Sequence, residues 1–158
     1  MINRKDKNIV TFKMALPDIK YQTKPDEERT IFLKSKPWWT EKHTQANEYL
    51  SSKFPGTHLV AHPSDSEEIA KFDQMQIDTP KADEVKLMPL IDSECHKNSM
   101  VLLYLGVAIE MRSGYALSDD GLWRHHSWAI DKDGRIIETT MERLAYATCN
   151  IVTELKFK

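Results

Sequence analysis

The chain has 158 residues, 41% of them apolar, and a formal net charge of −2, which fit one globular domain with a core of its own. Its 22 basic and 24 acidic residues are interspersed, so no basic patch favours nucleic acid as a partner. No apolar run approaches the length of a membrane span, and we expect a protein without membrane association.

The N-terminal residues and the two cysteines indicate the cellular compartment of the protein. Residues 1–7 carry basic side chains without a following apolar stretch, which argues against a secretory signal. Cys95 and Cys149 are the only cysteines, and a disulfide framework is not expected. We therefore expect a cytoplasmic protein in which Cys95 is reduced and available for chemistry.

The first third of the chain predicts short elements. Residues 8–16 alternate loosely between apolar and polar side chains and predict an edge strand. Residues 25–29 begin a short helix. Thr40 is a suitable N-cap for a further helix, which ends before Pro55.

The next segment predicts a strand, a helix and a connector. Residues 57–62 fit a brief buried strand. Ser64 is placed to cap a helix over residues 65–75, whose first turn is acidic. Residues 77–90 are polar and contain two prolines, so we expect them to form an irregular surface connector.

A central helix is expected next, with Asp92 or Ser93 as its N-cap and Cys95 in its first turn. Its body, residues 100–105, is apolar almost all round, which predicts a buried helix, and Gly106 ends it.

The rest of the chain predicts strands. They are expected over residues 107–111 leading into 114–117, and over 122–130, 135–140 and 148–157. The Asp-Lys-Asp-Gly turn at residues 131–134 predicts an antiparallel hairpin. The expected fold is α+β, an antiparallel sheet packed on a central helix that starts at Cys95. Residues 1–158 are expected to form a single domain in which residues 1–90 cover a catalytic core built from residues 91–158.

Cys95 is a candidate nucleophile. A thiol at a helix start lies near unpaired backbone N–H groups, which lower its pKa and favour the thiolate. The alternative is a small buried core residue, the common fate of a free cysteine.

Two adjacent histidines follow, and strand alternation puts them on opposite faces. His126 shares its face with Trp128, which predicts that His126 points inward and His125 toward solvent. The hairpin brings Glu138 within reach of His126. The alternatives are that His126 is a core histidine with its hydrogen bonds made and no catalytic role, and that Glu138 is an exposed charge on the strand.

These residues resemble the core of the transglutaminase-like superfamily of papain-type cysteine enzymes. The matching stretches, in order, are Gly106-Val107-Ala108, Ser113-Gly114-Tyr115, His126-Ser127-Trp128-Ala129-Ile130 and Glu138-Thr139-Thr140. The resemblance implies that Cys95 is the nucleophile, His126 the general base and acid, and Glu138 the orienting acid, in a position where Asp is usual. It implies acyl transfer on a peptide or amide substrate, to water or to an amine.

The oxyanion donor is left open by the sequence. The Cys95 backbone N–H is a natural contributor, and Trp38, Trp39 or Gln45 are further candidates. The alternative function is a papain-like fold retained as a catalytically inactive binding module.

A zinc site built from Cys95, His96, His125 and His126 is disfavoured, because His125 and His126 leave opposite faces of one strand. We expect no metal and no cofactor. His96 is expected to cap or face solvent, and Asn98 to bond nearby backbone or substrate.

Overall fold

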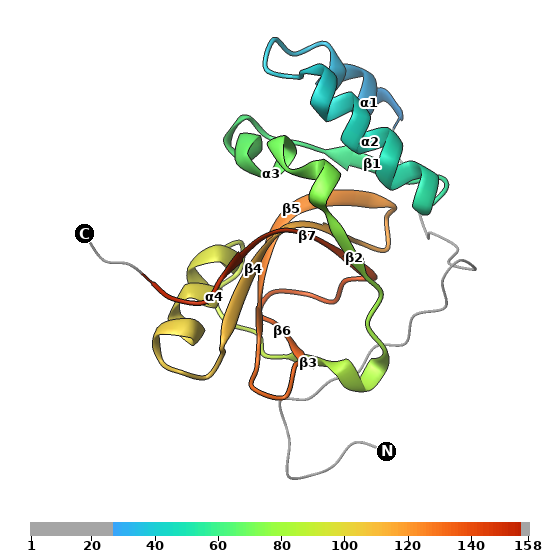
Figure 1. The fold of residues 1–158 in the computed structure, drawn as a ribbon. Coiled ribbons are helices and arrows are strands. Elements are labelled where there is room, and N and C mark those ends of the chain that lie inside the picture. The colour runs from blue at the N-terminus through green and yellow to red at the C-terminus, as the bar shows by residue number, and fades with distance from the viewer. Residues whose placement is uncertain (1–26, 156–158) are drawn as a thin grey trace.

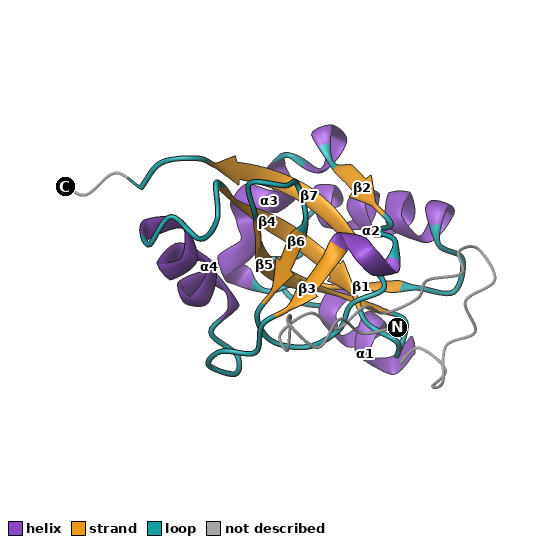
Figure 2. Cartoon of the chain, turned by 90° about the horizontal axis from the view of Figure 1, so that it is seen from below, coloured by secondary structure: helices purple, strands orange, loops and turns teal. Residues whose placement is uncertain are grey.

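The computed structural model of the protein describes residues 27–155 (Figures 1 and 2). The fold is α+β, with a curled, mainly antiparallel sheet and few helices. The strand predicted over residues 8–16 lies outside the described residues. Within the described residues, no helix is long and apolar enough to cross a membrane.

Seven strands of the described part of the chain form one sheet. They are β1 (His58–Val60), β2 (Gln76–Asp78), β3 (Val85–Leu87), β4 (Glu110–Leu117), β5 (Leu122–Ile130), β6 (Ile136–Glu138) and β7 (Ala145–Val152). The order is β2-β7-β4-β5-β6-β3, and β1 pairs in parallel with β5. The long antiparallel strands β7, β4 and β5 form the centre, and the three-residue strands extend it.

Strand β5 confirms the prediction to the residue, and the antiparallel pairing of β5 with β6 confirms the hairpin. Three other expectations need correction. The predicted connector at 77–90 contains β3 and most of β2, whose three-residue length is too short for a visible alternation. The strand predicted from residue 107 begins at Glu110, and the last strand begins earlier than expected, at Ala145.

The helices confirm one cap and contradict another. They are α1 (Glu27–Lys34), α2 (Glu41–Lys53), α3 (Ser66–Ala70) and α4 (Cys95–Tyr104). Thr40 precedes α2, as predicted, and its backbone N–H donates to Nδ1 of His43 at 3.0 Å. The helix predicted over 65–75 is wrong. Two short 3₁₀ turns flank α3 there, because the Asp65 carboxylate turns inward and accepts from Tyr115 Oη and from the His62 N–H.

The core divides around the sheet. Helices α1, α2 and α3 gather at one end of the sheet, while α4 lies beside the strands further along (Figure 1). A large cluster joins α2 and α3 to one face through Leu50, Ile69, Tyr115 and Trp123. A smaller cluster joins Leu102 of α4 to Ala129 and Ile137, and a third fills the other face around Trp128 and Tyr146.

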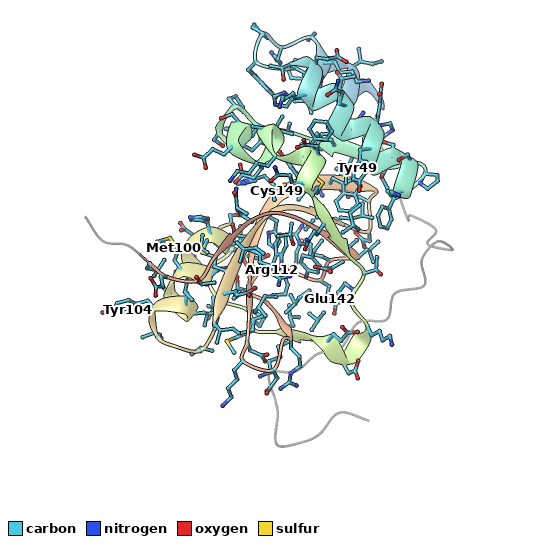
Figure 3. The ribbon with its side chains drawn as sticks, viewed as in Figure 1. Tyr49, Met100, Tyr104, Arg112, Glu142 and Cys149 are labelled. Atoms are coloured by element: carbon cyan, nitrogen blue, oxygen red, sulfur yellow. The ribbon has the colours of Figure 1, made fainter. Side chains whose placement is uncertain are left out.

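Helix α4 is not the fully buried helix that its apolar sequence predicts. It buries Asn98, Ser99 and Leu102, while Val101 and Tyr104 are 44% and 68% exposed. Figure 3 shows Met100 and Tyr104 on the side of α4 away from the sheet. The buried face of the helix therefore combines the apolar Leu102, which packs on Ala129 and Ile137, with the polar Asn98 and Ser99. Its predicted cap is also wrong, because Glu94 is the residue before the helix and Ser93 has a left-handed φ of 61°.

Candidate active site

Strand β5 has an interrupted edge. Strand β4 pairs with it along residues 123–130, so β1 and β6 must occupy the opposite edge. There β1 pairs with residues 122–124 and β6 with residues 129–130. Residues 125–128 have no strand partner on that edge within the described chain. The start of α4 lies at this gap, because the backbone N–H of Ser127 bonds to the Cys95 sulfur.

Cys95 also hydrogen-bonds to the side chain of His126. Burial raises the pKa of the thiol, but the hydrogen bond and charge of His126, with the Ser127 N–H, bring it below its ordinary value. Burial lowers the pKa of His126, and the charge of Glu138 and the bonds to Cys95 and Glu138 raise it above its usual range. The arrangement therefore favours a thiolate beside an imidazolium.

The far nitrogen of His126 is held by a carboxylate. His126 Nε2 lies 2.8 Å from Glu138 Oε1 and 3.0 Å from Oε2. Both carboxylate contacts use Nε2, so Nδ1 is the ring nitrogen left for a bond to Cys95. His126 is 2% exposed and Glu138 is fully buried. The predicted inward face of His126 and its hydrogen bond to Glu138 are confirmed.

Glu138 has further donors around it. Tyr146 Oη donates to Oε1 at 2.9 Å, and the backbone N–H and the hydroxyl of Thr140 each donate to Oε2 at 3.2 Å. The Arg143 Nε lies 3.8 Å from Oε1. Burial raises the pKa of Glu138, but the charge and hydrogen bond of His126, with Arg143 and the Thr140 N–H, lower it overall. The carboxylate is thus kept charged in the interior.

An aromatic wall fixes the plane of the imidazole. The Trp128 ring stacks on His126 with centroids 6.0 Å apart and planes at 23°. Tyr146 packs on Trp128 with centroids at 4.8 Å. The Trp two residues after the histidine therefore shares the histidine's face of β5, and it limits rotation of the ring.

Polar contacts anchor the start of α4. Asn98 Nδ2 donates to the backbone oxygen of Ile91 at 2.8 Å and to Thr139 Oγ1 at 3.3 Å. Ser99 Oγ donates to the Cys95 backbone oxygen at 2.8 Å. The predicted backbone bond of Asn98 is confirmed. The two bonds of Asn98 connect the segment before Cys95 to Thr139, the residue that follows Glu138 at the end of β6.

His125 and His96 lie on the other face of β5. His125 is exposed, as predicted, and its Nε2 lies 3.1 Å from Glu68 Oε1. His96 is exposed and its Nδ1 is 3.1 Å from Ser127 Oγ. In the described part of the chain, no group of three or more His, Cys, Asp or Glu side chains could hold a metal ion.

The side chains suggested as oxyanion donors are engaged or turned outward. Trp39 Nε1 donates to Thr44 Oγ1 at 2.9 Å. Gln45 is exposed on α2. The Trp38 ring packs against those of Trp39 and His43, with centroids 6.2 and 5.8 Å away. The N–H groups of the first helical turn, that of Cys95 included, have no partner within the helix.

Sequence reasoning missed most of the groups around Glu138. Thr140 stood in the quoted Glu-Thr-Thr motif, so a local signal for it existed. Tyr146 and Arg143 had none, because their contacts depend on how the segment after β6 turns back into β7. Glu68 was expected only as a first-turn helix residue, and its pairing with His125 is non-local.

Comparison of the chain with family models, with curated proteins and with solved structures finds no match.

Proposed function

We propose that the protein is a cysteine-dependent acyl transferase that acts on an amide. The observation that carries the proposal is the line of contacts from the Cys95 thiol through His126 to the buried Glu138. A nucleophile, a base and a group that orients the base are the parts that covalent acyl transfer requires. The start of α4 against the sheet supports the papain-type arrangement that the sequence resemblance implies.

The reaction follows from the geometry. The Cys95 thiolate attacks the amide carbonyl carbon, and the carbonyl π electrons move onto oxygen. When the oxygen re-forms the double bond, the C–N bond breaks, and the His126 imidazolium gives its Nδ1 proton to the leaving amine. This leaves a thioester and a neutral imidazole. His126 then takes a proton from water or an acceptor amine as that molecule attacks the thioester and expels the Cys95 thiolate.

Glu138 has an orienting role in this scheme. Its contact with Nε2 fixes the tautomer in which Nδ1 accepts or donates the reacting proton. The substrate is a peptide or another amide. The two free cysteines fit a reducing, cytoplasmic location.

Selective alkylation tests the nucleophile, and Cys149 is an internal control. Figure 3 shows Cys149 between the N-terminal helices and the sheet, and burial raises its pKa to about 12. With iodoacetamide at pH 7, we expect Cys95 to alkylate at least about tenfold faster than Cys149, since a tenfold change in thiolate accompanies each pKa unit. Peptide mass mapping measures both rates.

Cys95→Ser is the matched variant. It should retain the thermal midpoint, because the volume change is small, and it should abolish the fast alkylation. Equal rates at Cys95 and Cys149 in the wild-type protein would instead favour the inactive binding module.

A further inference from the structure

A second imidazole–carboxylate pair lies on the face of β5 opposite His126. His125 Nε2 is 3.1 Å from Glu68 Oε1, and the two side chains are 33% and 11% exposed. Glu68 lies on α3, an element far from Glu138 in the sequence. His125 and His126 are successive strand residues, so their side chains leave opposite faces. Cys95 lies at the gap in the edge of β5. The His126–Glu138 pair is therefore on one face of the strand beside it, and the His125–Glu68 pair is on the other.

Each member of this second pair stabilises the charged form of the other. The hydrogen bond to Glu68 raises the pKa of His125 against the effect of burial, and the charges of Glu68, Asp65 and Cys95 act in the same direction. The hydrogen bond to His125 lowers the pKa of Glu68, again against burial. His125 lies two residues before Ser127, whose backbone N–H bonds to the Cys95 sulfur, and the side chains of His125 and Ser127 leave the same face of β5.

The scheme of the proposed function still needs donors for the carbonyl oxygen, which becomes negative as the thiolate attacks. The Ser127 N–H is already bonded to the Cys95 sulfur, and His126 is bonded to the thiol. The Trp39 N–H is bonded to Thr44. His125 uses Nε2 for Glu68, and its Nδ1 has no hydrogen-bond partner among the residues that the structure describes.

We propose that His125, held as an imidazolium by Glu68, donates a hydrogen bond from Nδ1 to the carbonyl oxygen of the acyl group while Cys95 attacks the carbonyl carbon. This proposal rests on the proposed function and adds to it a catalytic residue on the second face of β5. His126 moves the proton of the leaving group. His125 keeps its own proton and stabilises the oxygen.

Two reactions of the same thiol separate these roles. Iodoacetamide loses iodide when the thiolate attacks its CH₂ carbon, and no oxyanion forms. With p-nitrophenyl acetate, the thiolate bonds to the carbonyl carbon, the oxygen becomes negative, and p-nitrophenolate leaves as the acetyl-enzyme forms. The measured quantity is the ratio of acylation rate to alkylation rate at Cys95, which cancels changes in thiolate content.

His125→Phe removes both N–H groups and retains a ring against Tyr115, whose centroid is 6.1 Å from that of His125. We expect the rate ratio to fall by a factor on the order of a hundred. Glu68→Gln should lower the ratio too, more strongly as the pH rises and His125 loses its proton. His96→Gln is the matched control, an imidazole next to Cys95 whose Nδ1 is engaged by Ser127, and its ratio should equal the wild-type value.

The outcomes are distinguishable. A normal ratio in His125→Phe, with fast alkylation of Cys95, overturns the role of His125 and leaves the proposed function standing. A fall in His96→Gln alone overturns it in favour of His96. If wild-type Cys95 reacts with neither reagent, the proposed function itself fails. If His125→Phe loses its near-ultraviolet circular dichroism, and so its fold, His125→Gln is the second variant, because its amide is a neutral hydrogen-bond donor. Its rate ratio should lie between that of the wild-type protein and that of Glu68→Gln at high pH. A wild-type ratio in His125→Gln overturns the need for a cationic donor.

Discussion

At the scale of single residues, the interior of the site holds balanced charges. The contacts lower the pKa of Cys95 and of Glu138 and raise that of His126, so they favour the charged forms of all three groups, and the Arg143 guanidinium adds a positive charge beside Glu138. Strand parity and the hairpin register are local properties, so the inward face of His126 and the reach of Glu138 could be predicted. The Arg143 and Tyr146 contacts could not, because they come from a turn without a strong local pattern.

Replacement of Glu138 by Gln tests the orienting role. The amide keeps the size of the carboxylate but loses its charge, so we expect turnover to fall by a factor on the order of a hundred to ten thousand. The free energy of unfolding should fall by about 1–3 kcal/mol, because an amide N–H₂ would face the Thr140 donors or Tyr146 and leave buried groups unpaired. Turnover and urea denaturation measure the two effects.

Tyr146→Phe is the matched control for this variant. It removes one donor to Glu138 and keeps the ring against Trp128, so it should cost only about 1 kcal/mol and affect turnover far less. Wild-type turnover in Glu138→Gln would reduce the site to a Cys95–His126 pair.

The pH dependence of alkylation tests the lowered pKa of Cys95. His126 and the Ser127 N–H stabilise the thiolate against the cost of burial, so the thiolate persists below the ordinary thiol pKa of 9.0. The iodoacetamide rate at Cys95 should therefore stay on its plateau as the pH falls below 9 and decline only near the lowered pKa. A small free thiol is the reference compound. A Cys95 profile that superimposes on that of the free thiol contradicts the assigned contacts.

At the scale of elements, a helix or strand could be predicted where the contacts that form it are local in the sequence. Strand β5 and the turn after it were predicted because alternation and turn residues are local in the sequence. Helix α4 was placed correctly along the chain but not by face, since Asn98 and Ser99 face inward to bond Ile91 and Cys95. Strands β2 and β3 form because they pair with β7 and β6. A pattern of only three residues does not reveal such pairing.

The register shift in β4 leads to a prediction at Gly114. The pairing of β4 with β7 shifts between Ser113 and Gly114, and a Cβ at Gly114 would lie 1.9 Å from the Ala147 backbone oxygen. Gly114→Ala must therefore displace backbone, and we expect it to destabilise the protein by about 2 kcal/mol or more. Thermal unfolding followed by circular dichroism measures this. Ser113→Ala, on the same strand, is the control, and equal midpoints for the two variants would contradict the close approach.

At the scale of the whole molecule, buried carboxylates couple folding to pH. The pKa of Glu138 and that of Glu68 are lowered in the folded protein, so each stabilises it above the ordinary value of 4.5 and loses that contribution as the pH falls through its lowered pKa. Asp78, whose pKa burial raises, acts in the opposite sense. His126, with a raised pKa, stabilises the fold below 6.5 and loses its effect as the pH rises through the raised value.

We therefore expect the free energy of unfolding, measured with urea, to decrease below pH 4.5. Glu138→Gln should show a shallower decrease on this acid side than the wild-type protein, because the variant lacks one carboxylate that must be protonated. An unchanged acid slope in the variant would contradict the lowered pKa of Glu138.

The gap in the edge of β5 has a consequence for how such a site is gained or lost. Strands β1 and β6 stop short of one another, and the thiol fills the space that remains. Two more paired residues at the end of β6, or three at the end of β1, would carry the hydrogen-bond ladder to Ser127 and exclude Cys95 from it. The fold would survive such a change with its core intact. Reactivity in this architecture therefore depends on the lengths of two neighbouring strands as much as on the identity of any reacting residue.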